Sequence, residues 1–391
     1  MEFKLNAEEA AFRDEIRAFL RRELTPDVFA KHRDASEQGM WTAEFTKRFR
    51  RKLGAAGYLG MGWPKEYGGG GRSRIYQAIL WDEMEYHRAP GLDRSMTYVP
   101  NAVMAFGSAA QKAALLPRMS RGEVSFFVGY SEPEAGSDLA NIKTKAVADG
   151  NDYIITGQKA FSSDAHMADY VWLQTRTDPT SKRHAGMTMF IVDMKSPGIT
   201  IAKHPTLAGW THHSVHFDNV RVPKTAVVGE VDQGWKVVMG AIDFERAALA
   251  SPGLVGYQFD RLLAWCAISR DGGDKPIDDA VVQDKLVELA IEAEGARIMS
   301  YWLASLHARG QYPQHETSLA LLVKRETARL FDEVGMDLLG PYAPLRTKSP
   351  HAQLDGEVEV EYRDHLYFQF AAGGFDITRN VIATRGLGLP R

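Results

Sequence analysis

The strongest constraint on the fold is a block of short β-rich runs, residues 124–228, with helical patterns on both sides. The runs "DYIITG", "DYVWLQT", "MTMFIVDM", "GITIAKH" and "SVHFDNVRV" are rich in β-branched and aromatic residues, and Gly, Pro, Asp or Asn separate them. No helical pattern lies between them. Several short strands without intervening helices predict a compact antiparallel sheet or barrel.

Helical periodicity dominates the rest of the chain. Apolar residues near the N-terminus recur at spacings of three and four, which is typical of a buried helix face: Phe12, Ile16, Phe19, Leu20 and Leu24. Further helices are expected over 42–56 and 73–86, and bundle-length patterns follow Gly234. We therefore expect an α+β multidomain chain with a helical domain over 1–122, an antiparallel β-domain over 123–232 and a helical bundle over 233–391.

The composition is that of an ordinary soluble globular protein, with 45% hydrophobic and 25% charged residues in 391. A net charge of -3 gives no indication of a nucleic-acid or anionic-membrane partner. Cys266 is the only cysteine, which excludes an internal disulfide and a Cys-rich metal site. No apolar run approaches the roughly 20 residues that span a bilayer, and the first residues do not resemble a signal peptide. We expect a cytoplasmic protein.

Two local features resemble ligand sites but are explained better without a ligand. The glycines 68–71 follow no strand and precede no Gly-Lys-Ser/Thr, so they predict a flexible turn. In the expected strand "THHSVHF", His212 and His216 share a face roughly 13 Å apart, while His213 points to the other face. No single metal ion would bind all three. The chain also lacks HExxH, Gly-x-Ser-x-Gly and EF-hand patterns.

The stretch "GYSEPEAGSD", residues 129–138, is the most informative motif. Its three carboxylates would repel a phosphate held by side chains. Backbone N–H groups near Gly136 can still hold an anion, and the hydroxyls of Ser131 and Ser137 can donate to a carbonyl or a ring nitrogen. A simple turn with local hydrogen bonds explains the same residues. The residues alone leave both interpretations open.

Four ordered motifs resemble the acyl-CoA dehydrogenase family: "GYSEPEAGSDLANIKTKA", "YIITGQKAFSSDAHMADYVWLQTRT", "FDNVRVPKTAVVGEVDQGW" and "RNVIATRGLGLPR". The resemblance runs essentially from end to end and implies a C-terminal four-helix bundle. It also implies FAD between β-domain and bundle, with part of the site supplied by a neighbouring subunit of a dimer or tetramer. An acyl-CoA thioester would lose its α proton to a carboxylate and its β hydride to flavin N5. An electron-transferring flavoprotein would be the acceptor.

The same resemblance assigns contacts with the cofactor. Tyr130 and Ser131 stand where the family touches the flavin ring, and Gly136 and Ser137 form the turn that contacts FAD or the CoA arm. The segment Phe161, Ser162 and Ser163 occupies the place that packs against the ring. The acids Glu132, Glu134 and Asp138 are expected to be framework residues and not the base.

The base is displaced from the position that many members use. In "AAGGFDITR" the residue at the usual glutamate position is Ala372, whose N–H remains able to bind the thioester carbonyl. In "AIDFERAALAS" Glu245 matches the base of a subgroup resembling isovaleryl-CoA and long-chain dehydrogenases. Asp243 and Arg246 beside it match residues that contact substrate. Asp376, at a usual flavin contact, is a rival base.

Several departures from the family pattern affect FAD binding. Arg270 is retained, but Gly273, Asp337, Pro341 and Gly374 replace residues that usually contact the cofactor. These losses raise a heteromer hypothesis, in which a partner chain completes the flavin site; a homodimer or homotetramer with diverged contacts is the alternative. Desulfinase-like or nitroalkane-oxidase-like chemistry and a non-catalytic subunit also stay open. The acyl group is not specified, although 89–103, with Arg94 and Tyr98, is expected to line its pocket.

Overall fold

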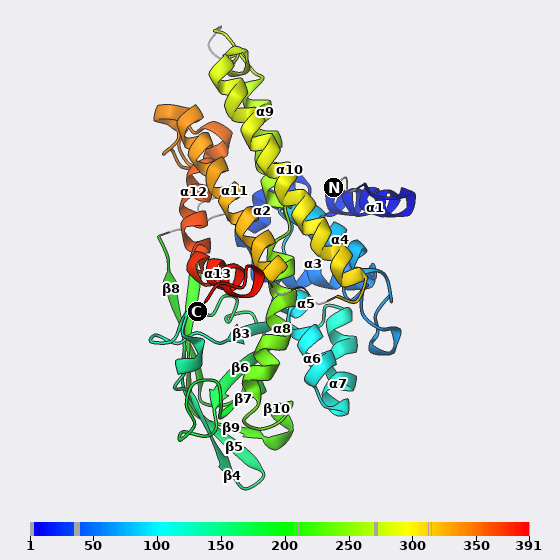
Figure 1. The fold of residues 1–391 in the computed structure, drawn as a ribbon, viewed down its shortest axis with the longest axis vertical. Coiled ribbons are helices and arrows are strands. Elements are labelled where there is room, and N and C mark those ends of the chain that lie inside the picture. Colours follow the sequence, from blue (N-terminus) through cyan, green and yellow to red (C-terminus); the bar gives the residue numbers. More distant parts are fainter. Residues whose placement is uncertain are drawn as a thin grey trace.

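The structure is a computed structural model that describes residues 4–34, 40–91, 93–207, 209, 211–269, 273–311, 313 and 315–390. Within these ranges the side chains of residues 33, 34, 40, 94, 95, 241 and 243–246 are not described. The molecule is elongated, with the sheet at one end, long C-terminal helices at the other and the N-terminal helices along one flank (Figure 1).

The N-terminal part is helical, as expected. Its helices are α1 Ala7–Glu23, α2 Pro26–His32, α3 Ala43–Ala55, α4 Arg74–Tyr86, α5 Arg94–Thr97, α6 Val99–Phe106 and α7 Ala109–Ser120, and β1 Arg33–Asp34 pairs with β2 Met40–Trp41. The expected helices over 42–56 and 73–86 are confirmed. Thr42 and Ser73 are their N-caps, and each side chain accepts a backbone N–H of the first turn.

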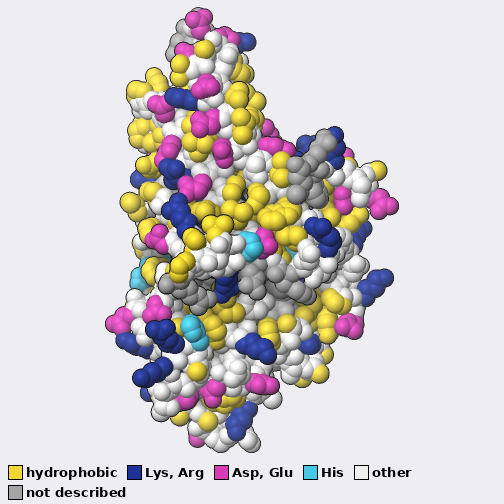
Figure 2. All heavy atoms as spheres, in the orientation of Figure 1, with side chains coloured by type: hydrophobic (Ala, Val, Ile, Leu, Met, Phe, Trp, Pro, Cys, Tyr) yellow, Lys and Arg dark blue, Asp and Glu magenta, His cyan; other side chains and the backbone are white. Residues whose placement is uncertain are grey.

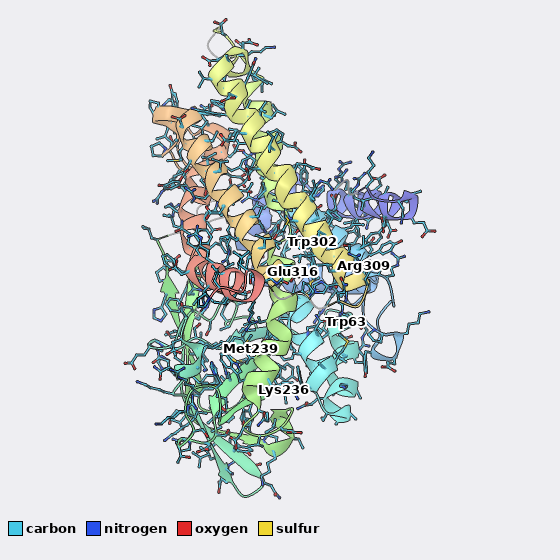
Figure 3. The ribbon with its side chains drawn as sticks, viewed as in Figure 1. Trp63, Lys236, Met239, Trp302, Arg309 and Glu316 are labelled. Atoms are coloured by element: carbon cyan, nitrogen blue, oxygen red, sulfur yellow. The ribbon has the colours of Figure 1, made fainter. Side chains whose placement is uncertain are left out.

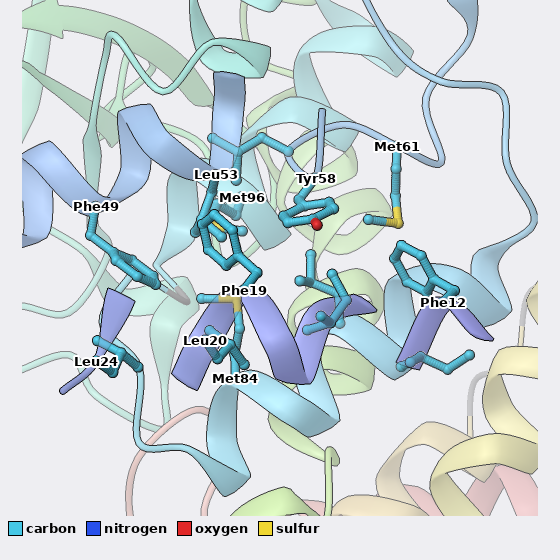
Figure 4. Packing of buried hydrophobic residues seen from close by; sticks show 14 of the residues in the cluster. Phe12, Phe19, Leu20, Leu24, Phe49, Leu53, Tyr58, Met61, Met84 and Met96 are labelled. Atoms are coloured by element: carbon cyan, nitrogen blue, oxygen red, sulfur yellow. The ribbon is translucent and has the colours of Figure 1, made fainter. Parts of the chain in front are cut away.

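The predicted apolar face of α1 enters the core of this part (Figure 4). Phe12, Phe19 and Tyr58 meet edge to face, with Phe19 and Tyr58 centroids 5.2 Å apart. The glycines 68–71 form a tight turn. A Cβ on Gly69 would lie 2.3 Å from the Trp63 carbonyl oxygen, so that position requires glycine.

The central part contains an eight-stranded sheet. Its strands are β3 Phe126–Gly129, β4 Lys145–Asp149, β5 Asp152–Lys159, β6 Tyr170–Arg176, β7 Met187–Asp193, β8 Ile199–Pro205, β9 Thr211–Pro223 and β10 Val227–Val228. The five runs that predicted strands are β5 to β9. Most pairings are antiparallel, as expected, but β3 and β4 each pair parallel to β6. A parallel pair needs a crossover of a dozen or more residues, and residues 130–169 supply one between β3 and β6.

The C-terminal helices are α8 Gly234–Leu249, α9 Gly253–Cys266, α10 Ala280–Ala308, α11 His315–Leu339, α12 Glu357–Phe368 and α13 Phe375–Val381. α9 to α12 form the bundle, and α11 packs on α9, α10, α12 and α13. α8 connects the parts of the molecule, since it contacts β7, α6 and α11 (Figure 1). Lys236 and Met239 lie along the end of α8 near the sheet, and Glu316 lies near its bundle end (Figure 3). Over the described residues, no helix has the length and apolarity needed to cross a bilayer.

Candidate active site

Tyr130, directly after β3, is anchored between the sheet, the N-terminal helices and α8. Its hydroxyl accepts a hydrogen bond from the Trp172 indole at 3.0 Å and shares another with the Tyr98 hydroxyl. Tyr98 is fully buried and also donates to the Val238 carbonyl of α8 at 3.4 Å. The expectation that Tyr98 contacts the acyl group is therefore not supported, because its hydroxyl is bound within the core. The side chain of Arg94 lies outside the described part.

The motif acid Glu132 is a buried framework residue. Its carboxylate lies 2.8 Å from the Lys159 ammonium and accepts the backbone N–H groups of Lys143 and Thr144 at 2.6 and 3.0 Å. Burial alone would raise the pKa of Glu132, but the charge and hydrogen bonds of Lys159 and these N–H groups outweigh it and lower the pKa. Burial lowers the pKa of Lys159 to about 8. Glu134, by contrast, forms an exposed ion pair with Lys143.

Lys159 also joins the two segments that were predicted to face a flavin. Its ammonium donates to the Tyr130 carbonyl at 3.1 Å, and the next N–H, from Ala160, donates to the Ser131 carbonyl at 2.8 Å. The segment with Tyr130 and Ser131 therefore runs beside the segment that begins with Phe161. Sequence reasoning did not identify Lys159, although the quoted motif contains it.

The segment after β5 presents one exposed ring and one buried hydroxyl. Phe161 is 65% exposed and adopts a left-handed backbone conformation with φ of 52°. Ser162 is 1% exposed, and its hydroxyl has no hydrogen-bond partner among the described residues. Its N–H donates to the His213 carbonyl at 2.9 Å, and the Ser163 hydroxyl lies 3.3 Å from Nδ1 of His212.

Two histidines of β9 pack beside this segment. His212 is buried, and its ring centroid lies 6.1 Å from Phe161 and 5.0 Å from Tyr367 at the end of α12. His213 is also buried and stacks on His166 at 4.7 Å, and burial lowers its pKa. His216 is exposed. The described residues contain no cluster of three or more His, Cys, Asp or Glu suited to a metal. His212 thus links the segment after β5 to α12 of the bundle.

The C-terminal loop with Ala372 is held by α11. Ala372 has a φ of 50°, and the carbonyls on either side of it, from Ala371 and Gly373, accept hydrogen bonds from the buried Arg325 guanidinium at 2.7 and 2.8 Å. Asp376 is exposed in the first turn of α13. Among the described residues, no hydrogen bond or ring contact joins Ala372 or Asp376 to residues 129–138.

The predicted base lies on α8. The backbone of Glu245 is two helical turns, about 10.5 Å, beyond Val238, whose carbonyl accepts the Tyr98 hydroxyl. The side chains of Asp243, Glu245 and Arg246 lie outside the described part, and so does the whole of Arg270. Their roles stay predictions.

A basic pocket of ≈ 880 Å³ lies beside the turn that carries Ser137. Gly136 and Ser137 are exposed, and a Cβ added to Gly136 would meet open space. The pocket is bordered by η2, Leu139–Asn141, by β4 and by the β6–β7 connection. One acidic and six basic or titratable side chains line it: Asp138, Lys143, Lys145, Arg176, Lys182, Arg183 and His184. Arg176 buttresses it by donating to the Ala140 and Arg183 carbonyls at 2.8 and 3.1 Å.

Comparison with known proteins identifies the family. Three family models match in order: the acyl-CoA dehydrogenase N-terminal domain over residues 6–123, the middle domain over 128–220 and the C-terminal domain over 232–387. The chain belongs to the acyl-CoA dehydrogenase family. Acyl-CoA dehydrogenase FadE26 of Mycobacterium tuberculosis is 36% identical over 400 aligned residues, covering 100% of this chain and 99% of the relative.

Two solved structures resemble the fold closely. The ChsE4-ChsE5 complex from Mycobacterium tuberculosis has a TM-score of 0.91 at 35% identity, and the Tcur3481-Tcur3483 steroid ACAD has 0.91 at 32% identity. Each comparison covers 100% of both chains. The predicted family, its three-part α+β fold and its oxidoreductase class are therefore confirmed.

Acyl-CoA dehydrogenases are FAD-dependent flavoproteins, and the local structure fits that cofactor. An exposed Phe161 ring offers an apolar surface for stacking, and the buried Ser162 hydroxyl has an unused donor and acceptor among the described residues. Ser131 is half-buried beside them. Figure 2 shows apolar side chains gathered across the middle of one face, between the long helices and the sheet.

Proposed function

We propose that this chain catalyses the α,β-dehydrogenation of an acyl-CoA thioester, with Glu245 as the base. Glu245 would take the α proton, while FAD accepts the β hydride and with it the two electrons that the substrate loses. The observation that carries the proposal is the adjacency of two predicted flavin-facing segments, joined by the Ala160 N–H to Ser131 carbonyl bond of 2.8 Å. The exposed Phe161 ring lies where the sheet meets α12, through the contacts of His212 with Phe161 and with Tyr367.

The proposed FAD contacts are made by residues whose polar or aromatic groups are available to bind the cofactor. Tyr130 would act through its backbone and ring, because its hydroxyl is already bound to Tyr98 and Trp172. The hydroxyls of Ser131, Ser162 and Ser163 would face the ring's polar edge. Asp376 and Arg270 are retained as proposed FAD contacts on the strength of the sequence.

Substrate binding would use three groups of different chemistry. The basic pocket fits the phosphates of coenzyme A, since among the described residues Lys145, Lys182 and Arg183 have no ion-pair partner there. Ser137, Asp243 and Arg246 would contact the CoA arm. The Ala372 N–H would bind the thioester carbonyl, whose oxygen gains negative charge as the α proton leaves.

Glu245 is preferred to Asp376 as the base because of their surroundings. Asp376 is exposed to water on a seven-residue helix. Removal of a weakly acidic α proton needs a base in a site from which water is excluded. Glu245 lies on α8, the helix that contacts β7, α6 and α11, and we propose that its side chain meets this requirement.

The assembly we propose is heteromeric, with a substrate bulkier than a simple fatty acyl chain. Two structures of similar fold are the ChsE4-ChsE5 complex and the Tcur3481-Tcur3483 steroid ACAD, each named for two chains. In this chain Asp337, which replaces a usual glutamine, forms an ion pair with Lys285 along the bundle. A carboxylate bound in this way is a poor contact for a neighbouring cofactor. A partner chain would supply the missing contacts; a homo-oligomer is the alternative outcome.

The remaining predictions complete the proposal. We also propose domain boundaries at 122/123 and 232/233 and a cytoplasmic location. The proposed electron acceptor is an electron-transferring flavoprotein. Desulfinase-like and nitroalkane-oxidase-like reactions would also begin with removal of a proton or group beside an activating function. The nitroalkane reaction is disfavoured because the basic pocket suits a CoA thioester and a nitroalkane has no phosphates, whereas a desulfinase-like reaction on a CoA thioester stays an alternative.

The test is an anaerobic titration of the purified protein with linear, branched and steroid-ring acyl-CoA thioesters. Bleaching of the flavin by one class identifies the substrate. Full FAD occupancy in the isolated chain would contradict the heteromer, and bleaching by a nitroalkane but by no thioester would contradict the reaction.

A further inference from the structure

Arg325 contacts the loop that the proposed function assigns to the thioester carbonyl. It lies on α11 and is 7% exposed. Its two terminal nitrogens donate to the Ala371 carbonyl at 2.7 Å and to the Gly373 carbonyl at 2.8 Å. One planar guanidinium thus binds the peptide group that precedes Ala372 and the carbonyl of the residue that follows it. Both distances lie in the ordinary range of N–H···O hydrogen bonds.

The first of these contacts fixes the direction of the Ala372 N–H. The carbonyl of Ala371 and the N–H of Ala372 belong to the same peptide group, and in a trans peptide they point in opposite directions. Because the carbonyl points at Arg325 on α11, the N–H points away from α11. No hydrogen-bond acceptor for this N–H exists among the described residues. The loop therefore presents a fixed donor that none of the described residues uses.

The backbone of Ala372 requires external support. Its φ of 50° lies in the left-handed region, which alanine avoids because of its Cβ. The carbonyl of Gly373 also accepts the Thr378 hydroxyl at 3.0 Å, so the turn is held from α11 and from α13. Arg325 holds the residues on both sides of Ala372, whereas Thr378 holds only the one that follows it.

We propose that Arg325 is a positioning residue that orients and polarises the peptide group between Ala371 and Ala372, so that its N–H binds the substrate's thioester carbonyl. The inference rests on the proposed function. A cationic donor on the carbonyl draws electron density from the peptide, which strengthens its N–H as a donor at the opposite end. When the base takes the α proton, the C–H electron pair moves toward the thioester oxygen. The N–H then stabilises the charge that forms there.

The experiment compares Arg325→Met, Arg325→Lys and Arg329→Met in the full chain, with any partner chain that co-purifies. Arg329 is the matched control, because it lies one turn further along α11 and binds Glu326 and Glu333 at the surface. The substrate is whichever thioester of the panel has the highest kcat/KM. FAD content, kcat, KM and the infrared band of a 13C-labelled thioester carbonyl are measured.

We expect Arg325→Met to retain FAD and to lower kcat by about 30-fold while KM stays within about threefold, since losing one donor of this kind slows catalysis by up to 10²–10³. Its carbonyl band moves toward that of the free thioester. Arg325→Lys recovers part of kcat, because an ammonium binds one carbonyl at a time. Arg329→Met matches the wild type.

Three results would overturn the inference. One is a wild-type kcat in Arg325→Met, and another is an unchanged carbonyl band. The third is a parallel loss of FAD and activity in both Arg325 variants, which would indicate a structural role alone. If Arg325→Met does not fold, the band in Arg325→Lys decides. A wild type that holds FAD but is bleached by no thioester contradicts the proposed function instead.

Discussion

The Lys159 ammonium and the Glu132 carboxylate lie 2.8 Å apart, with 0% and 6% of their side chains exposed. They stand 27 residues apart in the chain and come from the two segments predicted to face the flavin. Lys159 also binds the Tyr130 carbonyl at 3.1 Å. A single buried ion pair therefore fixes the spacing of the two segments that are predicted to face the flavin.

Removing the cation of this pair should damage both stability and FAD binding. Lys159→Met leaves Glu132 buried without its charged partner, which typically costs about 3–5 kcal/mol. We expect a lower midpoint of urea unfolding and a weaker FAD affinity, measured by flavin fluorescence. Lys143→Met is the control, because its ion pair with Glu134 on the same loop is exposed. Equal FAD affinity in Lys159→Met and Lys143→Met would contradict the role of the pair.

A second buried acid should make stability depend on pH. Burial and, to a smaller extent, the neighbouring Glu83 charge raise the pKa of Asp82 from 3.8 to about 7, although the Tyr301 hydroxyl at 3.1 Å partly opposes them. The folded protein therefore binds more protons than the unfolded chain between about pH 4 and pH 7. Its stability contribution falls as pH rises through that window.

Asp82→Asn removes this dependence, because the amide oxygen still accepts the Tyr301 hydroxyl without a charge. We expect the variant to exceed the wild type in free energy of unfolding by up to about 4 kcal/mol at pH 8 and by little at pH 4, using 1.4 kcal/mol per pKa unit. Urea titrations at both pH values measure it. The exposed Asp14→Asn serves as control, and a gain for Asp82→Asn that is the same at both pH values would refute the explanation.

The basic pocket should recognise the phosphates of coenzyme A. Lys182→Glu with Arg183→Glu is expected to raise KM for an acyl-CoA by about tenfold without changing kcat, since two exposed charge contacts contribute about 0.7 kcal/mol each. The exposed Lys224→Glu on the same domain is the control. An acyl-pantetheine lacks these phosphates, so its KM should not distinguish the variant from the wild type. If the KM for the acyl-pantetheine rises in the variant as well, the pocket does not bind the phosphates.

Sequence periodicity was sufficient for the order of elements. The three- and four-residue spacing of Phe12, Ile16 and Phe19 predicted the buried face of α1, and the alternating runs predicted β5 to β9. The parallel pairing of β3 with β6 was not predicted, because strand partners depend on the path of the chain and not on local alternation.

The candidate site was predictable where a motif is contiguous. Tyr130, Ser131 and the segment after Lys159 were identified in this way. Arg325 was not, because it lies 46 residues from the carbonyl of Ala371 and has no motif of its own. Tyr98 was expected near the substrate because it lies in residues 89–103, and only the fold shows that Tyr130 and Val238 bind its hydroxyl.

The central claim is that Glu245 removes the α proton while FAD is bound in place. It is tested most directly by anaerobic flavin bleaching in Glu245→Gln and in Asp376→Asn, using the best thioester of the panel. The account predicts that Glu245→Gln retains FAD and loses at least about 10³-fold in bleaching rate, because amide nitrogen and oxygen cannot take the proton. It predicts that Asp376→Asn bleaches within about tenfold of the wild type. Bleaching of Glu245→Gln at the wild-type rate, with loss of bleaching in Asp376→Asn, would contradict it.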